Sequence, residues 1–558
     1  MCGIWALFGL GSQTSFENNS AFSKVWHRGP DAWRVEYDQK MKNCFVGFHR
    51  LAIVDSLYGM QPMKLHAYPH LTVLCNGEIY NCKQLKEQYG FNYETNCDVE
   101  CILHLYADGG IEHCARNLDG VFAFCLIDSK ESKVFLARDP YGVRPMFRLH
   151  SELGILAACS EAKGLMEITT QLGDGAWKMD PFPPGCFEEY KINGDGKATV
   201  IQKKPFYNIG DKPLFRPFVP FDDLTKDIQS NIKSLLTAAV KKRLMADRRI
   251  GCLLSGGLDS SLVASLLVKL SKEENLPYKI QSFAVGMGTS PDIIAARQVA
   301  QYIGTEHHEI IFTPEDVKEV LDEVLYHTET LDITTVRASI PMYILARYIK
   351  KNTDTTVIFS GEGADEVAQG YIYFRDAPSS AAAHSDSVRL LKDIYLFDGL
   401  RADRTISAHS LELRVPFLDL QFTHYYLGLD PELRTPKGGV EKHLLRSAFD
   451  DTDLLPKSIL WRHKEAFSDG VASVKKSLFQ VIQEQVESKI SAEALSKAVH
   501  KYPHCTPKTK ESLYYREAFE KNFPGQSHFT PYFWMPRWTD ATDPSARFIK
   551  HYAAHKTE

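Results

Sequence analysis

The 558-residue chain lacks the features that mark membrane, secreted and zinc-binding proteins. No apolar run is long enough to span a bilayer, and no basic region followed by an apolar stretch opens the chain, so neither a membrane span nor a secretory signal is indicated. The 12 cysteines form no paired CxxC framework, which argues against a zinc site and a disulfide scaffold. Reduced cysteines are typical of the cytosol, and we expect a cytoplasmic protein.

The chain also lacks a strong net charge and internal repeats. A net charge of −5 is small for this length, which argues against general binding to nucleic acid or to a membrane surface. The composition, 44% hydrophobic and 24% charged, is that of an ordinary globular protein. Because 558 residues are too many for one core, we expect two or more domains.

The first 205 residues contain short apolar segments separated by turn signals such as Gly-Pro-Asp and Asn-Gly. A longer helical pattern lies near 99–107. This alternation predicts packed sheets flanked by helices. The predicted strands are Gly3–Leu7, Cys44–His49, Leu71–Asn76, Val121–Asp128 and Lys133–Arg138.

A change of pattern follows. Four prolines between 205 and 220 predict a linker over 206–225. From 226 to 530 apolar residues recur at helical spacing and alternate with short strands, which predicts an α/β domain with a parallel, doubly wound sheet. We expect strands at 250–254, 280–285 and 357–360, and helices at 228–240, 261–270 and 293–303. A polar, aromatic-rich tail occupies 531–558.

Cys2 is the first candidate for chemistry. Removal of Met1 would leave Cys2 with a thiol and a free α-amine on one carbon, which is a nucleophile beside its own base. An α-amine titrates at roughly 7.7–8.0 and a thiol at about 8.5, so the two can exchange a proton near neutral pH. A cysteine at position 2 also occurs by chance, so further residues are needed to decide.

Three later segments fit a pocket for a small zwitterion. Arg50 leaves a strand and can hold a carboxylate bidentately. Asn76 and Gly77 can supply two donors to an oxyanion, and Asp98 can receive an ammonium group. Each residue alone also has a structural interpretation: a surface ion pair for Arg50, a hairpin turn for Asn-Gly, and a helix N-cap for Asp98.

A glycine-rich turn after the strand at 250–254 is the candidate phosphate loop. Ser255-Gly256-Gly257-Leu258-Asp259-Ser260-Ser261 joins a strand to a helix, so hydroxyls and the helix N-terminus can face an anion. It is not a GxxxxGK[ST] loop, which argues against a standard γ-phosphate transferase. A second strand end, Ser360-Gly361-Glu362, should reach the same crevice of a parallel sheet.

The first 165 residues resemble the N-terminal-nucleophile glutamine amidotransferases, which implies an αββα sandwich. The resemblance rests on Cys2-Gly3-Ile4, His27-Arg28-Gly29-Pro30-Asp31, His49-Arg50-Leu51, Asn76-Gly77-Glu78-Ile79-Tyr80-Asn81 and Arg138-Asp139-x-x-Gly142-x-Arg144-Pro145. It implies Cys2 as nucleophile and Asn76 and Gly77 as oxyanion donors. The implied glutamine-binding residues are Arg50, Leu51, Ala52, Ile53, Val54, Asn76, Gly77, Glu78 and Asp98.

The order of the two modules resembles the asparagine synthetase family, of the glutamine-hydrolysing eukaryotic type. SGGLDSS resembles an ATP pyrophosphatase loop, and the segments near 334–339, 400–404, 412–419, 462–470 and 541–547 match as well. The resemblance implies ATP binding, an AMP-forming reaction and Mg²⁺ held by Asp259 and Asp365. The implied ATP-binding residues are Leu254, Ser255, Gly256, Gly257, Asp259, Ser260, Val285, Ser360 and Gly361.

Catalytic roles in the second domain are also implied by this resemblance. Glu362 would act in intermediate formation and ammonia attack, while Arg337 and Lys464 would place positive charge at the reacting phosphate. A structural ion pair for Arg337 and a surface position for Lys464 stay open as alternatives. Ala364 departs from the family, which usually has serine there.

The expected reaction uses glutamine, aspartate and ATP, and the enzyme is expected to form a homodimer. Two rival interpretations are an enzyme of the same architecture with another carboxylate acceptor, such as a β-lactam-forming synthetase, and a non-catalytic sensory homologue. Relatives with another acceptor tend to lose the nucleophilic cysteine, which this chain keeps. The intact Cys2, Asn76, Asp98, Asp259 and Glu362 also argue against a sensory homologue.

Overall fold

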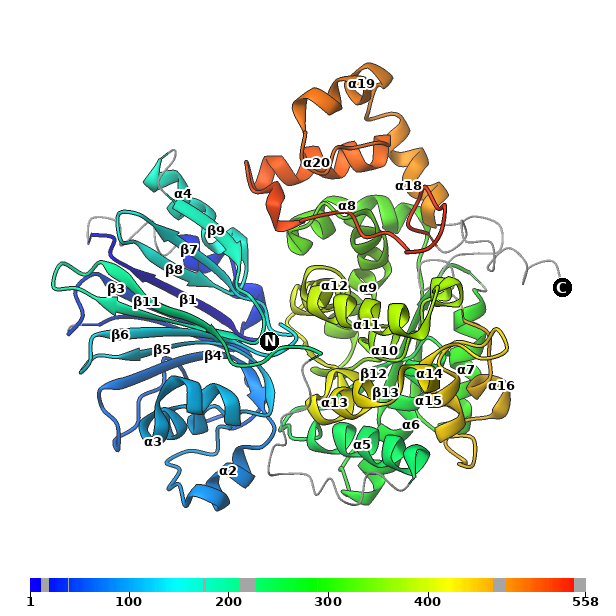
Figure 1. The fold of residues 1–558 in the computed structure, drawn as a ribbon, viewed down its shortest axis with the longest axis horizontal. Helices are drawn as coiled ribbons and strands as arrows, with labels where there is room; N and C mark the ends of the chain where they lie inside the picture. Colours follow the sequence, from blue (N-terminus) through cyan, green and yellow to red (C-terminus); the bar gives the residue numbers. More distant parts are fainter. Residues whose placement is uncertain are drawn as a thin grey trace. The chain divides into compact units, whose positions relative to one another are not determined.

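Two antiparallel sheets face each other in the first part of the chain (Figure 1). The first has the strand order β2-β3-β1-β8-β7-β9, and the second has the order β11-β10-β6-β5-β4. The strands are β1 (Gly3–Phe8), β2 (Ala32–Tyr37), β3 (Cys44–Arg50), β4 (Leu71–Ile79), β5 (Gly120–Asp128), β6 (Lys133–Arg138), β7 (Phe147–Ser151), β8 (Leu156–Cys159), β9 (Trp177–Pro181), β10 (Cys186–Ile192) and β11 (Ala198–Pro205).

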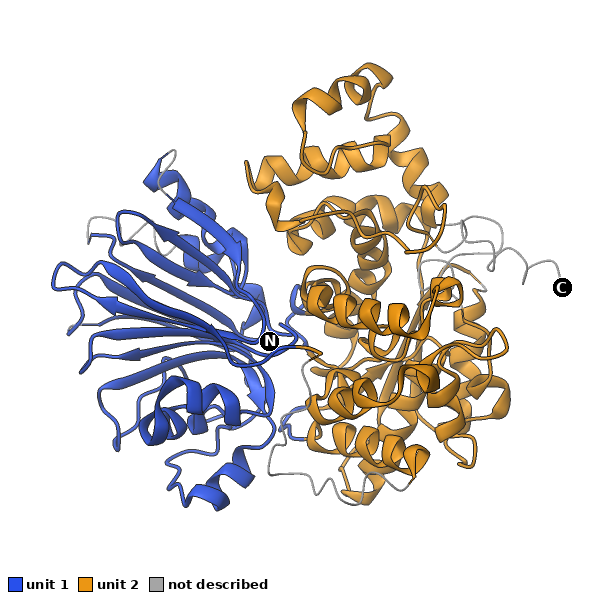
Figure 2. Cartoon of the chain, viewed as in Figure 1, with its two compact units in different colours: residues 1–208, 245–248, 407–412 blue, residues 209–244, 249–406, 413–558 orange. Residues whose placement is uncertain are grey.

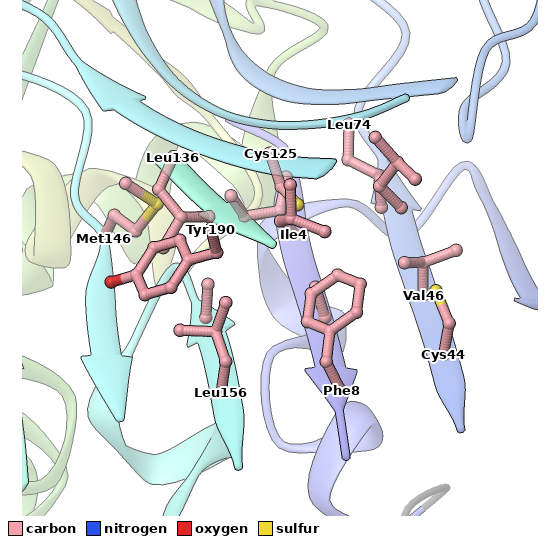
Figure 3. Close-up of a cluster of buried hydrophobic side chains, with 14 of the residues drawn as sticks. Ile4, Phe8, Cys44, Val46, Leu74, Cys125, Leu136, Met146, Leu156 and Tyr190 are labelled. Atoms are coloured by element: carbon pink, nitrogen blue, oxygen red, sulfur yellow. The ribbon is translucent and has the colours of Figure 1, made fainter. Parts of the chain in front are cut away.

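One hydrophobic core fills the space between these sheets (Figure 3). Ile4 and Phe8 point into it from β1, while Leu74 and Cys125 enter from β4 and β5. Every second residue of a strand faces the same side, so the even-numbered residues of β1 line the core. Cys2 packs at the margin of this core, in line with Ile4.

Helices cover the outer faces of both sheets. α3 (Glu100–Asn117) contacts β4 and β10, and α2 (Cys82–Tyr89) contacts α3. On the other sheet the indole Nε1 of Trp5 donates to the carbonyl of Gly164, which precedes α4 (Met166–Leu172). This arrangement confirms the predicted αββα sandwich.

A five-stranded sheet forms the centre of the second part of the chain, in the order β14-β13-β12-β15-β16. Its strands are β12 (Ile250–Leu253), β13 (Gln281–Gly286), β14 (Glu306–Ile311), β15 (Val357–Phe359) and β16 (Glu412–Arg414). β12 pairs in parallel with both β13 and β15, and β13 pairs in parallel with β14. The predicted parallel sheet is therefore confirmed.

Helices surround this sheet. α6 packs against β12, and α7 and α9 pack against β13. Their bounds are α5 (Ile228–Lys242), α6 (Leu258–Glu273), α7 (Pro291–Ile303), α8 (Pro314–Thr328), α9 (Ile333–Asn352), α10 (Ala364–Val367), α11 (Ser380–Asp393), α12 (Asp398–Ser407), α13 (Leu420–Gly428), α14 (Pro431–Arg434), α15 (His443–Ala448), α16 (Lys457–Leu460), α18 (Leu478–Glu487), α19 (Ala492–Lys501) and α20 (Lys510–Asn522).

The structure adds elements that the sequence pattern did not predict. α11 covers a stretch whose pattern is weak, because the Ser379 side chain caps its first turn while Ala383 and Leu391 are buried. β14 carries four charged or histidine residues in six, so it has no apolar run. β16 has three residues, too few for a period to emerge.

The computed structural model describes residues 1–11, 20–38, 40–173, 177–210, 227–288, 290–464 and 478–545. These form two units (Figure 2): unit 1 contains 1–208, 245–248 and 407–412, and unit 2 contains 209–244, 249–406 and 413–558. The predicted linker, 206–225, and the predicted tail, 531–558, lie partly outside the described residues, so these boundaries stay predictions. No helix among the described residues has the length and apolar character needed to cross a membrane.

Candidate active sites

Cys2 lies half-buried at the start of β1. Its Sγ is 3.4 Å from the amide nitrogen of Leu51, and the Arg28 guanidinium donates to its carbonyl at 2.9 Å. Burial raises the pKa of the Cys2 thiol, while the nearby α-amine and Leu51 lower it in part. A thiol in this place needs a base to become a thiolate.

The surroundings of Cys2 favour a neutral amine. The Met1 α-amine is buried and donates to the carbonyl of Leu411 at 3.2 Å. Burial lowers the pKa of this amine to about 5. Removal of Met1 would turn the Cys2 backbone nitrogen into an α-amine on the same carbon as the thiol side chain, where it could act as the base.

The backbone of β4 presents a free N–H at Gly77. Gly77 lies opposite Phe122 of β5, but both backbone groups of Phe122 bond to Asp139 instead, at 3.2 and 2.8 Å. The Gly77 N–H therefore points away from β5, toward the side where β4 has no neighbouring strand. A side chain at Gly77 would collide with the Val121 carbonyl, 2.4 Å from its Cβ position.

The neighbouring N–H groups on this edge already have acceptors. Cys75 donates to the side-chain oxygen of Gln61 at 2.6 Å, and Ile79 donates to Asp98 at 2.6 Å. Gly77 lies between them, and none of the described residues accepts from its N–H. Within the described part of the chain, this edge therefore presents a single open donor.

Asn76 supplies the second donor. Its side chain is fully buried, and neither its nitrogen nor its oxygen has a hydrogen-bond partner among the described residues. A buried amide without a partner costs free energy, of the order of 1–3 kcal/mol per group. A bound oxyanion next to Asn76 and Gly77 would satisfy both donors.

The side chain of Arg50 is fixed by the loop that follows β3. Its guanidinium donates to the carbonyls of Val54, Asp55 and Ser56. Gly59 makes room for it, because a Cβ there would lie 2.6 Å from a terminal nitrogen of Arg50. Arg50 is thus a buried, positioned cation, and the surface ion pair considered above is wrong.

The two other structural alternatives are also wrong. Asn76 and Gly77 lie inside β4, so they form no hairpin turn. Asp98 is buried and accepts from Ile79, and the N-cap of α3 is Val99. Of the other predicted glutamine-binding residues, Leu51 to Val54 form the loop beside Cys2 and Arg50, and Glu78 is buried in β4.

In unit 2, the predicted ATP-binding residues surround a cavity of about 270 Å³. Leu254, Val285 and Ser360 lie at the carboxyl ends of the neighbouring parallel strands β12, β13 and β15 or just after them, where α/β sheets bind ligands. Ser255, Gly257, Asp259, Ser260 and Gly361 complete the predicted set that lines this cavity.

The remaining predicted residue, Gly256, does not line the cavity but shapes the loop. Its φ of +72° favours glycine, and a Cβ would lie 2.5 Å from Ala295 of α7. The two serine hydroxyls of the loop, on Ser255 and Ser260, are 2.9 Å apart. Gly361 also needs its lack of a side chain, because a Cβ would lie 2.8 Å from the Ser260 nitrogen.

A cluster of two carboxylates and two lysines lines the same cavity. The Lys442 ammonium lies 2.5 Å from both Asp259 and Asp365, and Lys464 lies 2.6 Å from Asp365. Burial alone would raise the pKa of the Asp365 carboxyl, but Lys442 and Lys464 hold it below its usual range. The second oxygen of Asp259, Oδ1, is buried without a partner among the described residues.

Glu362 points into the cavity from the loop after β15. Arg401 on α12 donates to Glu362 and to Asp398, at 2.8 Å in each case. Burial raises the pKa of Glu362, and Arg401 offsets part of this effect. Glu362 is therefore held in a fixed position beside one cation.

Arg337 lines the cavity, and its charge is already paired. Its guanidinium bonds to both oxygens of Glu511, at 2.8 and 2.6 Å, and to both oxygens of Asp543, at 2.9 and 3.0 Å. The ring of Phe479 lies 4.7 Å away. Arg337 therefore forms the structural ion pair that was the alternative interpretation of this residue. It could contact a phosphate only by giving up a hydrogen bond to Glu511 or Asp543.

Sequence reasoning missed Lys442 as a site residue. It lies outside the glycine-rich motifs, and the only mark of it in the sequence is a single lysine in Val440-Glu441-Lys442-His443, which predicts no function by itself. Lys442 is 2% exposed and has a φ of +56°. Lys464 joins the cluster with only part of its side chain exposed, so the surface position considered for it is wrong.

Family models match both units. The asparagine synthase model matches residues 231–389 and 375–542, and the glutamine amidotransferase domain model matches residues 1–176. The chain belongs to the asparagine synthase family.

Curated members of this family match almost the whole chain. Asparagine synthetase [glutamine-hydrolyzing] from Gallus gallus is 56% identical over 559 residues, with 99% of each chain covered. The proteins of the same name from Bos taurus and Homo sapiens are 54% and 53% identical, again with 99% of each chain covered. The likeness to the family thus includes both sites.

Arg50→Ala should raise the KM for glutamine by roughly 100-fold, because removal of a buried charged partner costs a few kcal/mol of binding. Steady-state glutaminase kinetics would measure the change. Arg116→Ala, which removes an exposed arginine of the same unit, is the control and should leave the KM unchanged. An unchanged KM in Arg50→Ala would contradict the pocket.

Lys442→Ala should lower ATP-dependent turnover by roughly 100-fold or more, because two buried carboxylates lose the cation between them. ATP and Mg²⁺ titrations at fixed ammonia would measure it, with circular dichroism to show that the protein is folded. Glutaminase activity in unit 1 should persist. Lys457→Ala, at an exposed lysine, is the control. Normal ATP turnover in folded Lys442→Ala would contradict the role of the cluster.

Proposed function

We propose that this chain is a carbon–nitrogen ligase that makes asparagine from aspartate and ATP, with glutamine as nitrogen donor. The observation that carries the proposal is the pair of open donors at Asn76 and Gly77 on β4, a strand that contacts β1 just after Cys2. Full-length likeness to the asparagine synthetases [glutamine-hydrolyzing] supports it. The unit 2 cavity, with its phosphate-loop geometry, supports the use of ATP.

In the proposed first half-reaction, the Cys2 thiolate attacks the side-chain carbonyl carbon of glutamine. A carbon–sulfur bond forms, and Asn76 and Gly77 bind the oxyanion. The Cys2 α-amine takes the thiol proton and passes it to the leaving nitrogen as the carbon–nitrogen bond breaks. Water then hydrolyses the thioester and releases glutamate. Arg50 would hold the α-carboxylate of glutamine and Asp98 its α-amine.

In the proposed second half-reaction, the β-carboxylate of aspartate attacks the α-phosphorus of ATP. Pyrophosphate would leave toward the loop from Ser255 to Ser260, which lines the cavity at the start of α6. Ammonia then replaces AMP on the β-carbonyl carbon and gives asparagine. Lys464 would stabilise phosphate charge, and Glu362, held by Arg401, would receive a proton from the attacking ammonia. Arg337 would join after an exchange of its partners.

The residues at the cavity fit a magnesium ion. Asp259 and Asp365 bring carboxylate oxygens to one point, now shared with Lys442, and Asp259 Oδ1 has no partner among the described residues. Hard oxygen donors are those that Mg²⁺ prefers. When bound there, Mg²⁺ would neutralise charge on the departing pyrophosphate.

The proposed setting is the cytosol, with two copies of the chain in a homodimer and with neither nucleic acid nor membrane as a partner. All 12 cysteines are free thiols, which fits a reducing compartment. The net charge of −5 gives no general affinity for nucleic acid.

The protein mixed with glutamine, aspartate and ATP–Mg²⁺ should yield asparagine, glutamate, AMP and pyrophosphate. Cys2→Ala should abolish the use of glutamine and spare synthesis from free ammonia, because the two chemistries occupy different units. Amino-acid analysis and nucleotide chromatography measure both results. ADP as the main nucleotide product, or loss of ammonia-dependent synthesis in folded Cys2→Ala, would contradict the proposal.

Intact-mass analysis of the active protein should show Met1 removed and Cys2 unmodified, because an amide nitrogen cannot take up the thiol proton. A non-cleavable N-terminal tag should silence glutaminase and spare the ammonia reaction. A C-terminal tag, the matched control, should spare both. Full glutamine use by a preparation proven to retain Met1 would rule out an N-terminal nucleophile.

A further inference from the structure

β2 (Ala32–Tyr37) is an edge strand of the first sheet in unit 1, paired with β3 on one side only. Its outer side presents large exposed side chains: Trp33 is 68% exposed and Tyr37 44%. Trp26, close before it in the chain, is 59% exposed. An exposed edge with apolar side chains tends to pair with another strand.

The register of β2 shows which backbone groups are open. The Asp38 amide donates to the Cys44 carbonyl of β3, so residue 38 faces β3. Backbone groups alternate along an antiparallel strand, so those of Glu36 and Arg34 also face β3. The N–H and C=O groups of Trp33, Val35 and Tyr37 therefore point away from the sheet.

These three residues are symmetric about Val35. If a second β2 pairs antiparallel with the first around a two-fold axis at Val35, then Val35 lies opposite itself. Trp33 then lies opposite Tyr37 of the partner subunit, and the outward backbone groups of all three residues meet in hydrogen-bonded pairs. These three residues of β2 thus all find backbone partners in the same register of the two strands.

The charges of β2 are self-complementary in this same register. Within one chain Glu36 lies 3.0 Å from Lys64 and 3.8 Å from Arg34, and in this register it also lies opposite Arg34 of the partner subunit. Opposite charges directly across a strand pair are favourable, and aromatic pairs such as Trp33 with Tyr37 add to the pairing. Arg34 and Glu36 share one face of the strand, while Trp33, Val35 and Tyr37 share the other.

Resting on the homodimer proposed above, we propose that two copies of the chain associate through β2, which extends the first sheet of each copy into one continuous sheet across the two-fold axis. The open backbone groups at Trp33, Val35 and Tyr37 and the crossed Arg34–Glu36 pairs specify the partner as a second copy of this chain. The exposed side chains of Trp33 and Tyr37 lie beside the new strand pair and become partly buried from solvent when it forms.

Other sheet edges in the described part of the chain do not offer this pattern. β11 carries Lys203 and Lys204 and no acidic residue, so two copies would repel. β9 ends in Pro181, and on the free edge of β4 the N–H groups of Cys75 and Ile79 already donate to Gln61 and Asp98. The two edges of the unit 2 sheet are β14, which lacks lysine and arginine, and β16, which is buried.

A single cysteine at the axis tests the register. Val35→Cys would place two thiols opposite each other on Cα atoms roughly 5.5 Å apart, within the range that a disulfide spans. Oxidised glutathione would accept the two electrons and two protons as the S–S bond forms and would leave as two reduced molecules. We expect a reducible band at twice the chain mass on a gel.

Tyr37→Cys is the matched control, because residue 37 lies opposite residue 33 of the partner and not opposite itself. It should form no linked dimer, and neither should the wild type with its own 12 cysteines. Linkage by both variants alike, or by neither, would overturn the proposed register.

A charge swap tests the pairing without new cysteines. Sedimentation at micromolar concentration should give a dimer for the wild type. Arg34→Glu should weaken it by about 10-fold or more, because like charges then face each other twice per dimer. The triple variant Arg34→Glu/Glu36→Arg/Lys64→Glu should restore the dimer, because the complementary pairs return in reversed order and position 36 keeps an opposite charge from residue 64.

Ile201→Glu is the control for this series, because it adds a charge to the exposed edge strand β11 and should leave the dimer intact. A monomeric wild type, or a dimer that Arg34→Glu leaves unchanged, would overturn the proposal. Neither readout uses catalysis. A failure of asparagine synthesis and a failure of this interface would therefore be distinguished.

Discussion

The pairing of β4 with β5 is the constraint on which the first site depends. One side of β4 is hydrogen-bonded to β5, and the Gly77 N–H points to the other side, where β4 has no neighbouring strand. The same pairing sends the Asn76 side chain to the core side, next to the strand that begins after Cys2. A backbone donor and a side-chain donor are thereby fixed before any ligand arrives, which is the preorganisation that oxyanion stabilisation requires.

Charge balance organises the second site. Asp259 and Asp365 would repel each other in a poorly solvated cavity, and Lys442 lies within 2.5 Å of both. Arg401 plays the same part for Glu362 and Asp398. Since buried charges are tolerated when each has a partner, the cavity can hold many ionised groups and exchange some of these partners for phosphate, metal or substrate.

The two units use sheet geometry in different ways. In unit 1 the important groups lie along a strand edge and at the end of β3, where Arg50 is held by three carbonyls. In unit 2 they lie where parallel strands end, so that Leu254, Val285 and Ser360 converge although they are far apart in the chain. The free edge of β2 shows a third use, in which the backbone itself presents the contact surface.

Local pattern in the sequence by itself determined β1, the strands from β3 to β6 and the parallel arrangement of the unit 2 sheet, and motifs that resemble a known family pointed to the candidate site residues. Short motifs fix these features because glycine, serine and alternating apolar residues act within a few positions of one another. The tertiary structure alone decided that Arg337 is paired with Glu511 and Asp543 and that Lys442 bridges two carboxylates. It also decided which way Gly77 and Val35 point, because pairing between distant segments sets which backbone groups stay free.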